Sequence, residues 1–257
     1  MIALHDLVKT YGKFSAVNGV SLDVQPGEIH GFLGPNGAGK TTTLRMIAGL
    51  LKPTSGRVEV NGHDLATHAE DAKASLGFIP DRPFIYEKLT AGEFLRFHGG
   101  LFGVNGDGIG ARVREMLELF ELGQWENELV ESFSHGMKQR LVMCAAFLHR
   151  PRAVVVDEPM VGLDPRGARL IKDVFRKMSA GGVAILMSTH TLEVAEEMCD
   201  RISIILKGRI IARGTVNELR AMAGGGGAGR DEEESQLTAV FLRLTGGGAL
   251  QEIDEIV

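Results

Sequence analysis

The stretch Gly34-Pro35-Asn36-Gly37-Ala38-Gly39-Lys40-Thr41 fits the pattern G-x-x-x-x-G-K-[ST]. An apolar run at residues 29–33 precedes it, and a helix-like pattern at residues 42–50 follows it. A strand, a glycine-rich loop and a helix in this order are typical of a phosphate-binding loop. The stretch therefore predicts a strand and a helix with an anion site between them.

The residue types in this loop suit that chemistry. Glycine lets the backbone curl without Cβ clashes, so that successive N–H groups point inward at phosphate oxygens. The helix that follows adds the positive end of its dipole. Lys40 would then reach the β- and γ-phosphates of a nucleotide, and the Thr41 hydroxyl would bind Mg²⁺.

The composition is that of a globular protein. With 257 residues, of which 44% are hydrophobic and 24% are charged, the chain can bury the core of one large domain or of a domain with a subdomain. A net charge of -5 argues against a general nucleic-acid binder. Cys144 and Cys199 are too few for a disulfide framework, so buried free thiols in a reducing cytoplasm are expected.

The sequence gives no sign of a membrane segment of its own. We expect no signal peptide, because residues 1–8 lack a basic head followed by a long apolar core. The longest apolar runs, near residues 183–187 and 202–206, fall far short of the ~20 residues that a spanning helix needs. A membrane role would therefore depend on a partner.

The first part of the chain predicts a short antiparallel sheet. Apolar and polar residues alternate over residues 2–24, with interruptions at Tyr11-Gly12 and Asn18-Gly19, and residues 57–60 form another expected strand. Tyr11 has two interpretations: a stacking platform for an adenine ring, or an ordinary edge-strand tyrosine.

The middle third predicts a helical subdomain at about residues 85–150. A strand at residues 77–80 ends on Asp81. Helical spacing then recurs three times, at residues 91–102, 110–122 and 141–148.

After Arg152, apolar strands alternate with helices. The expected strands are residues 153–156, 183–187 and 202–206, and the expected helices are residues 166–178 and 192–198. Unbroken apolar strands spaced by helices imply a parallel sheet that is covered on both faces. A hairpin strand at residues 209–212 and a capped helix at residues 215–222 complete a predicted domain of residues 1–222.

The C-terminal part has a different composition. Glycines at residues 224–227 and charges at residues 230–234 predict a flexible linker over residues 223–235. Residues 236–257 would then form a short helix and a tail, because Leu237, Val240 and Phe241 fall on one helical face.

Two carboxylates follow the apolar strand at residues 153–156. Asp157 and Glu158 would lie at the carboxyl end of this strand, where open α/β sheets bind their ligands. Asp157 would hold Mg²⁺, directly or through water, and Glu158 would orient or deprotonate an attacking water. The alternative is a strand end with two solvated acids.

Two further features have open interpretations. Ser134 and Gly136 open a helix whose N-terminus is either a second anion site or an ordinary capped end. His190 ends the strand at residues 183–187, where it is either structural or a hydrogen-bond partner of the γ-phosphate or of the attacking water.

In their order along the chain, these features resemble the motifs of the ATP-binding subunit of an ABC transporter, over nearly the whole length from Ile2 to about Thr245. The matching motifs are an aromatic A-loop at Tyr11, Walker A at residues 34–41, a Q-loop at Pro80-Asp81, a signature at residues 133–137, Walker B at residues 154–158, a D-loop at residues 162–164 and a switch histidine at His190. The resemblance implies an α/β P-loop NTPase fold with a mostly parallel core sheet, an N-terminal antiparallel β subdomain and an α-helical subdomain.

The same resemblance implies the ligands and the site. ATP and Mg²⁺ would be bound, with adenine stacked on Tyr11. The implied ATP-binding residues are Tyr11, Gly34, Pro35, Asn36, Gly37, Ala38, Gly39, Lys40, Thr41 and Thr42 of one copy, with Ser134 and Gly136 of a second copy closing over the same ATP. The implied Mg²⁺ ligands are Thr41, Asp157 and Asp81, and the implied catalytic residues are Glu158 and His190.

Two positions depart from the family pattern. Asp81 stands where the Q-loop usually has glutamine, and the signature is Phe-Ser-His-Gly-Met where Leu-Ser-Gly-Gly-Gln is usual. Asp81 is shorter and charged, so its coupling to a partner would differ, although an aspartate can still bind Mg²⁺ or water. Ser134 and Gly136 are kept. Both variants resemble the branch associated with ABC-2-type exporters.

The implied function is to power transport, by export, through a separate permease, from the cytoplasmic face of the cell membrane. An alternative is a clamp-like ABC ATPase on ribosome or DNA. Translation-type members carry two cassettes, but this chain has one Walker A, and genome-maintenance members insert long coiled coils, but only 94 positions separate Lys40 from Ser134. A P-loop kinase is a third alternative, which would leave Ser134, Glu158 and His190 without a role.

Overall fold

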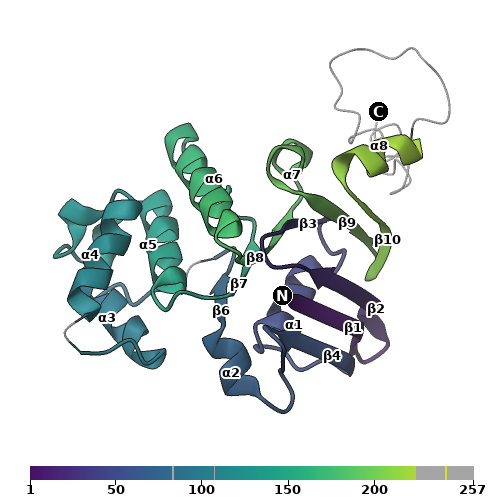
Figure 1. The fold of residues 1–257 in the computed structure, drawn as a ribbon, viewed down its shortest axis with the longest axis horizontal. Helices are drawn as coiled ribbons and strands as arrows, with labels where there is room; N and C mark the ends of the chain where they lie inside the picture. Colours follow the sequence, from purple (N-terminus) through teal and green to yellow (C-terminus); the bar gives the residue numbers. More distant parts are fainter. Residues whose placement is uncertain (83, 107, 224–240, 242–257) are drawn as a thin grey trace.

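The computed structural model describes residues 1–82, 84–106, 108–223 and 241 (Figure 1). The first residue of the predicted linker, Ala223, instead ends a helix. The rest of the linker, and the predicted C-terminal helix and tail apart from Phe241, lie outside these described residues.

A four-stranded antiparallel sheet holds the N-terminal part of the chain. Its strand order is β2-β1-β4-β5. The strands are β1 (Ile2–Tyr11), β2 (Phe14–Val24), β4 (Ser55–Val60) and β5 (His63–Asp64). The turn between β1 and β2 pairs Tyr11 with Phe14, so the two aromatic residues lie opposite each other.

The predicted interruption at Asn18-Gly19 is wrong, because β2 runs through it as one strand. The pairs Leu7 with Val20 and Val8 with Asn18 leave Gly19 as an extra residue. Gly19 has a φ of 72°, which glycine adopts without strain. A bulge of this kind inserts a residue without ending the ladder.

The second sheet is mostly parallel, as the sequence predicts. Its order is β10-β9-β3-β8-β7-β6, and β10 is antiparallel to β9 while the other pairs are parallel. The strands are β3 (Ile29–Leu33), β6 (Leu76–Ile79), β7 (Ala153–Asp157), β8 (Ala184–Thr189), β9 (Arg201–Leu206) and β10 (Arg209–Gly214).

Both faces of the parallel sheet are buried, in two different cores. Val154 and Val156 belong to the core that includes the helical middle third, whereas Val155 belongs to the core shared with the antiparallel sheet. Successive side chains of a strand point to opposite faces. An unbroken valine run therefore serves both cores, which confirms the predicted α/β architecture.

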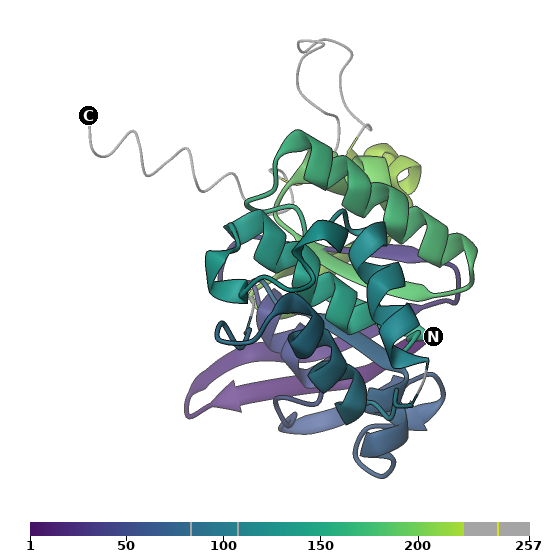
Figure 2. The same ribbon diagram turned by 90° about the vertical axis from the view of Figure 1, so that its left-hand side faces the viewer.

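Helices cover the sheets (Figure 1). They are α1 (Lys40–Ile47), α2 (Ala69–Ala74), α3 (Ala91–Leu101), α4 (Ile109–Leu119), α5 (His135–Phe147), α6 (Pro165–Ala180), α7 (Leu192–Met198) and α8 (Val216–Ala223), with 3-10 turns η1 (Gly123–Trp125) and η2 (Val130–Ser132). The helices of the middle third, in teal, lie in front of the strands in Figure 2. The turn that joins β3 to α1 and the ends of β7 and β8 share one edge of the sheet, because parallel strands end at the same side.

Candidate nucleotide-binding site

The glycine-rich loop joins β3 to α1 and is tightly packed. A Cβ atom at Gly34 would collide with the backbone oxygen of Ile205. Gly39 has a φ of 108°, and a Cβ atom there would lie 2.5 Å from the backbone oxygen of Ala16. Glycine is therefore required at both positions, because the backbones of β9 and β2 pack directly against the loop.

Lys40 lies folded over its own loop. Its Nζ donates to the backbone oxygens of Gly34, at 2.5 Å, and Pro35, at 3.3 Å. Burial lowers the pKa of the Lys40 ammonium, and the charges of Glu158 and Asp157 act in the opposite direction. Among the described residues, no carboxylate is within ion-pair distance of Lys40. A largely buried cation that is held only by carbonyl oxygens suits an incoming anion.

Asp157 joins three elements of the site. The Thr41 hydroxyl donates to its Oδ2 at 2.8 Å, and the Ser188 hydroxyl donates to its Oδ1. Thr41 lies in the first turn of α1, Asp157 ends β7 and Ser188 lies in β8, so residues far apart in sequence meet here. A hydroxyl and a carboxylate are hard oxygen donors of the kind that Mg²⁺ takes together with substrate phosphates. The residues present therefore fit Mg²⁺.

Glu158 and His190 lie next to each other. His190 Nδ1 is 2.8 Å from Glu158 Oε1, and the backbone N–H of Glu158 donates to Ser188 at 3.1 Å. Glu158 has a φ of 51°, which turns the chain sharply after β7. The turn separates its side chain from that of Asp157. The two acids predicted from adjacent positions therefore have different partners.

A cavity of about 340 Å³ lies over the loop. It is lined by Tyr11, Phe14, Ala16, Pro35, Asn36, Gly37, Gly39, Lys40, Thr41, Thr42, Asp81, Asp157 and Glu158. Most of the residues predicted from separate motifs thus surround one space. Gly34 and Ala38 shape the loop from behind, since both are buried and do not line the cavity.

The sequence interpretation missed two residues of the site. Phe14 is 63% exposed at the mouth of the cavity, across the turn from Tyr11. Ser188 holds Asp157. Phe14 could have been found from the sequence, because a two-residue turn after Tyr11 places Phe14 opposite it in the hairpin. The role of Ser188 depends on the pairing of β7 with β8, which no local pattern shows.

Ser134 and Gly136 do not line this cavity. Ser134 is the N-cap of α5, and its hydroxyl accepts from the Met137 N–H at 3.4 Å. A Cβ atom at Gly136 would lie 3.6 Å from Leu163 and 3.7 Å from the backbone oxygen of Gly162. The predicted signature and D-loop therefore lie against each other, outside the cavity that the phosphate loop lines.

The family model described as ABC transporter matches residues 17–161, which include the loop, the signature and both carboxylates. This chain belongs to that family. It is an ABC ATPase, the ATP-binding and ATP-hydrolysing subunit of a transporter. In the part of the chain that the structure describes, no helix has the length and apolar character to cross a membrane.

Similar ABC ATP-binding proteins cover most of the chain. A daunorubicin resistance ATP-binding protein, DrrA3, of Streptomyces coeruleorubidus is 40% identical over 84% of this chain and 69% of its own length. The linearmycin resistance ATP-binding protein LnrL of Bacillus subtilis is 37% identical over 88% and 72%. The ABC-type transporter ATP-binding protein EcsA of the same organism is 35% identical over 93% and 96%.

Solved ABC cassettes have the same fold. An ATP-binding subunit of an ABC transporter has a TM-score of 0.86, with 33% identity, over 95% of this chain and 99% of its own. The dimeric cassette MJ0796 in a post-hydrolysis state, bound to ADP and Pi, has a TM-score of 0.77, with 25% identity, over 84% and 99%.

Proposed function

We propose that this ABC ATPase powers export across a membrane through a separate membrane-spanning permease, and that two copies close head to tail over ATP. The direction is supported by the relatives named as drug resistance proteins. The pairing is supported by a similar cassette solved as a dimer. The subunit would lie peripherally, at the cytoplasmic face of the cell membrane.

Within one copy, the loop would hold the phosphates. The backbone N–H groups after β3, the α1 N-terminus and Lys40 would bind the triphosphate, and Tyr11 would stack on the adenine. Thr41 and Asp157, with Asp81 beside them, would hold Mg²⁺, which neutralises charge on the β- and γ-phosphates when bound. These residues orient ATP and exclude bulk water from its phosphates.

Glu158 would activate the water. Its carboxylate lies on the cavity wall and accepts the proton of a water that attacks the γ-phosphate, which gives ADP and phosphate. His190 would hold this carboxylate in place through its Nδ1 and contact the γ-phosphate through its other nitrogen. Loss of the γ-phosphate would weaken the contact between the two copies across the bound nucleotide, so that the dimer could reopen.

The position of Ser134 is the observation that carries the pairing. A serine N-cap and a glycine at the start of the 13-residue helix α5 would make an anion site, yet neither residue lines the cavity of its own copy. The Ser134 end of one copy would meet the phosphate loop of the other. Each ATP would then join two subunits.

The permease would contact a second cavity of about 850 Å³ between α1, β6 and α3. Large apolar side chains are exposed there, including Phe84 (84% exposed), Tyr86 (61%) and Leu101 (68%). An exposed apolar patch of this kind is typical of a protein contact. Asp81 lines both this cavity and the nucleotide cavity, so a permease segment bound here would lie one side chain from the Mg²⁺ position.

A complementation experiment tests the pairing. Ser134→Arg and Lys40→Ala should each abolish ATP turnover alone. Mixed in equal amounts, they should regain activity, because a heterodimer has one intact site made from Lys40 of the first chain and Ser134 of the second. Ser132→Arg, two positions away on the exposed η2 turn, is the matched control and should keep turnover. If the mixture stays inactive while each variant folds, the head-to-tail arrangement is wrong.

A further inference from the structure

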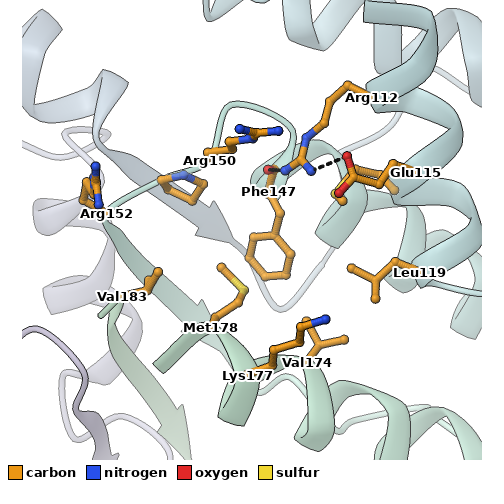
Figure 3. Close-up of a pocket in the computed structure, with 12 residues that line it drawn as sticks. Arg112, Glu115, Leu119, Phe147, Arg150, Arg152, Val174, Lys177, Met178 and Val183 are labelled. Atoms are coloured by element: carbon orange, nitrogen blue, oxygen red, sulfur yellow. Dashed lines mark hydrogen bonds and ion pairs between the residues drawn. The ribbon is translucent and has the colours of Figure 1, made fainter. Parts of the chain in front are cut away.

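A third cavity lies at the opposite edge of the parallel sheet from the nucleotide. Its volume is about 410 Å³, within the size range of small-molecule sites. Its walls come from α4, the end of α5, the starts of β7 and β8, and α6 (Figure 3). None of its lining residues takes part in the nucleotide site.

The floor of this cavity is apolar. The Phe147 ring points into it, Met178 lies beside the ring, and Val183 lies beyond Met178 in Figure 3. Phe147 is the last residue of α5, and its ring also contacts Phe175 of α6 edge to face. A flat apolar group would therefore find an aromatic face and a thioether, both of which favour ring contacts.

Cations surround the rim. Arg150, Arg152 and Lys177 lie around the cavity from different directions in Figure 3. All three are exposed, and within the described residues their side chains have no hydrogen bond or direct ion pair. The whole chain carries a net charge of -5, so this concentration of positive charge is local to the cavity.

The fourth cation of the rim is already engaged. Arg112 donates to the backbone oxygens of Phe147, at 2.8 Å, and Leu148, at 3.1 Å, and forms an ion pair with Glu115 at 2.8 Å. It therefore fastens α4 to the end of α5. The pKa of Glu115 is lowered chiefly by the hydrogen bond from Arg112, with Arg150 and Lys177 contributing charge in the same direction. The lining residues include one carboxylate and four cations, which leaves the rim positive.

We infer that this cavity binds a small aromatic anion, a ring that carries a carboxylate or phosphate group. The ring would lie against Phe147 and Met178, and the anionic group would pair with Arg150, Arg152 and Lys177. Since the ligand would contact the end of α5 on one side, and α6 and the start of β7 on the other, it would link the helical middle third to the rest of the fold. This site is separate from the nucleotide site, and the inference does not rest on the proposed role in export.

The test is calorimetric titration of the full chain with 1-naphthoate, in saturating ADP so that the nucleotide site is filled. Binding should be at least tenfold tighter for 1-naphthoate than for the neutral 1-naphthamide or for acetate, which lacks the ring. The double variant Arg152→Gln/Lys177→Gln should weaken 1-naphthoate binding at least tenfold. Both variant positions are exposed, and retained ATP turnover shows that the variant is folded.

The control removes the same charge elsewhere. Arg114 on α4 and Arg209 on β10 are exposed and do not line the cavity, so Arg114→Gln/Arg209→Gln should bind 1-naphthoate like the wild type. The inference is overturned if the Arg152/Lys177 variant binds as tightly as the wild type. It is equally overturned if 1-naphthamide or acetate binds as tightly as 1-naphthoate, or if ADP abolishes binding.

Discussion

Glu158 and His190 lie 2.8 Å apart at the ends of two adjacent parallel strands, with the carboxylate mostly buried and the imidazole half exposed. The carboxylate thus has one side on the nucleotide cavity and one side held by a ring. This arrangement suits a general base, because the His190 ring fixes the direction in which the Glu158 carboxylate points. It is reached because β7 and β8 are neighbours in the sheet.

Replacement of the base should separate ATP binding from hydrolysis. Glu158→Gln keeps the size of the side chain and removes the proton acceptor, so ATP turnover should fall by at least about 100-fold. ATP-dependent dimers should accumulate in size-exclusion chromatography. Glu193→Gln, on the exposed first turn of α7, should behave like the wild type. Turnover near the wild-type rate in Glu158→Gln would remove Glu158 from its proposed role.

The metal position makes a second prediction. Asp157→Asn keeps the size of the side chain and one of the two oxygens that accept from Thr41 and Ser188, but removes the negative charge. The Mg²⁺ concentration needed for half-maximal turnover should rise at least about tenfold. A titration of MgCl₂ at fixed ATP measures this. Asp173→Asn, exposed on α6, is the control, and an unchanged Mg²⁺ requirement in Asp157→Asn would contradict the assignment.

Acid should destabilise the contact that His149, just after α5, makes with the start of β6. The pKa of His149 is lowered from 6.5 to about 4, chiefly by burial, and His98 and Arg112 lower it further. The hydrogen bond that its Nε2 donates to the backbone oxygen of Leu76 acts in the opposite direction and raises the pKa. The pKa of His98 is also lowered by burial. The native state therefore favours neutral rings, so this stability is fully present above pH 6.5 and is lost as the pH falls toward 4.

Urea unfolding at pH 7 and pH 5 measures this effect. His149→Gln keeps a donor for Leu76 but does not titrate, so the difference in unfolding free energy between the two pH values should become smaller. His68→Gln, at an exposed position before α2, should keep the wild-type difference. A His149→Gln variant with an unchanged difference would show that the buried ring does not control the acid response.

A helix cap predicts a purely structural effect. Thr90 and Glu93 form a capping box at the start of α3, in which each side chain accepts from the backbone N–H of the other residue. Thr90→Ala should lower the free energy of unfolding by about 1 kcal/mol. Urea unfolding measures the loss. Thr90→Ser, which keeps the acceptor, should restore most of it, and equal loss in both variants would exclude the cap as the cause.

The phosphate loop could be predicted from the sequence because all of its residues lie within one short segment. The glycines, Lys40 and Thr41 are consecutive or nearly so, and the apolar strand before them and the helix after them fix where the loop lies. The same holds for the valine run before Asp157, which predicted a strand buried on both faces. The continuous course of β2 was not predicted, since Asn18-Gly19 reads as a turn and only pairing with β1 makes it a bulge.

The sequence by itself determined the fold class and predicted the phosphate-binding, acidic and histidine positions, since each rests on spacing within a short segment. Only the tertiary structure decided which residues lie together: Phe14 opposite Tyr11, Ser188 on Asp157, and Ser134 outside the cavity. It also gathered Arg150, Arg152 and Lys177 around Phe147. These contacts depend on strand order and helix packing, which bring distant segments together without leaving a pattern in the local sequence.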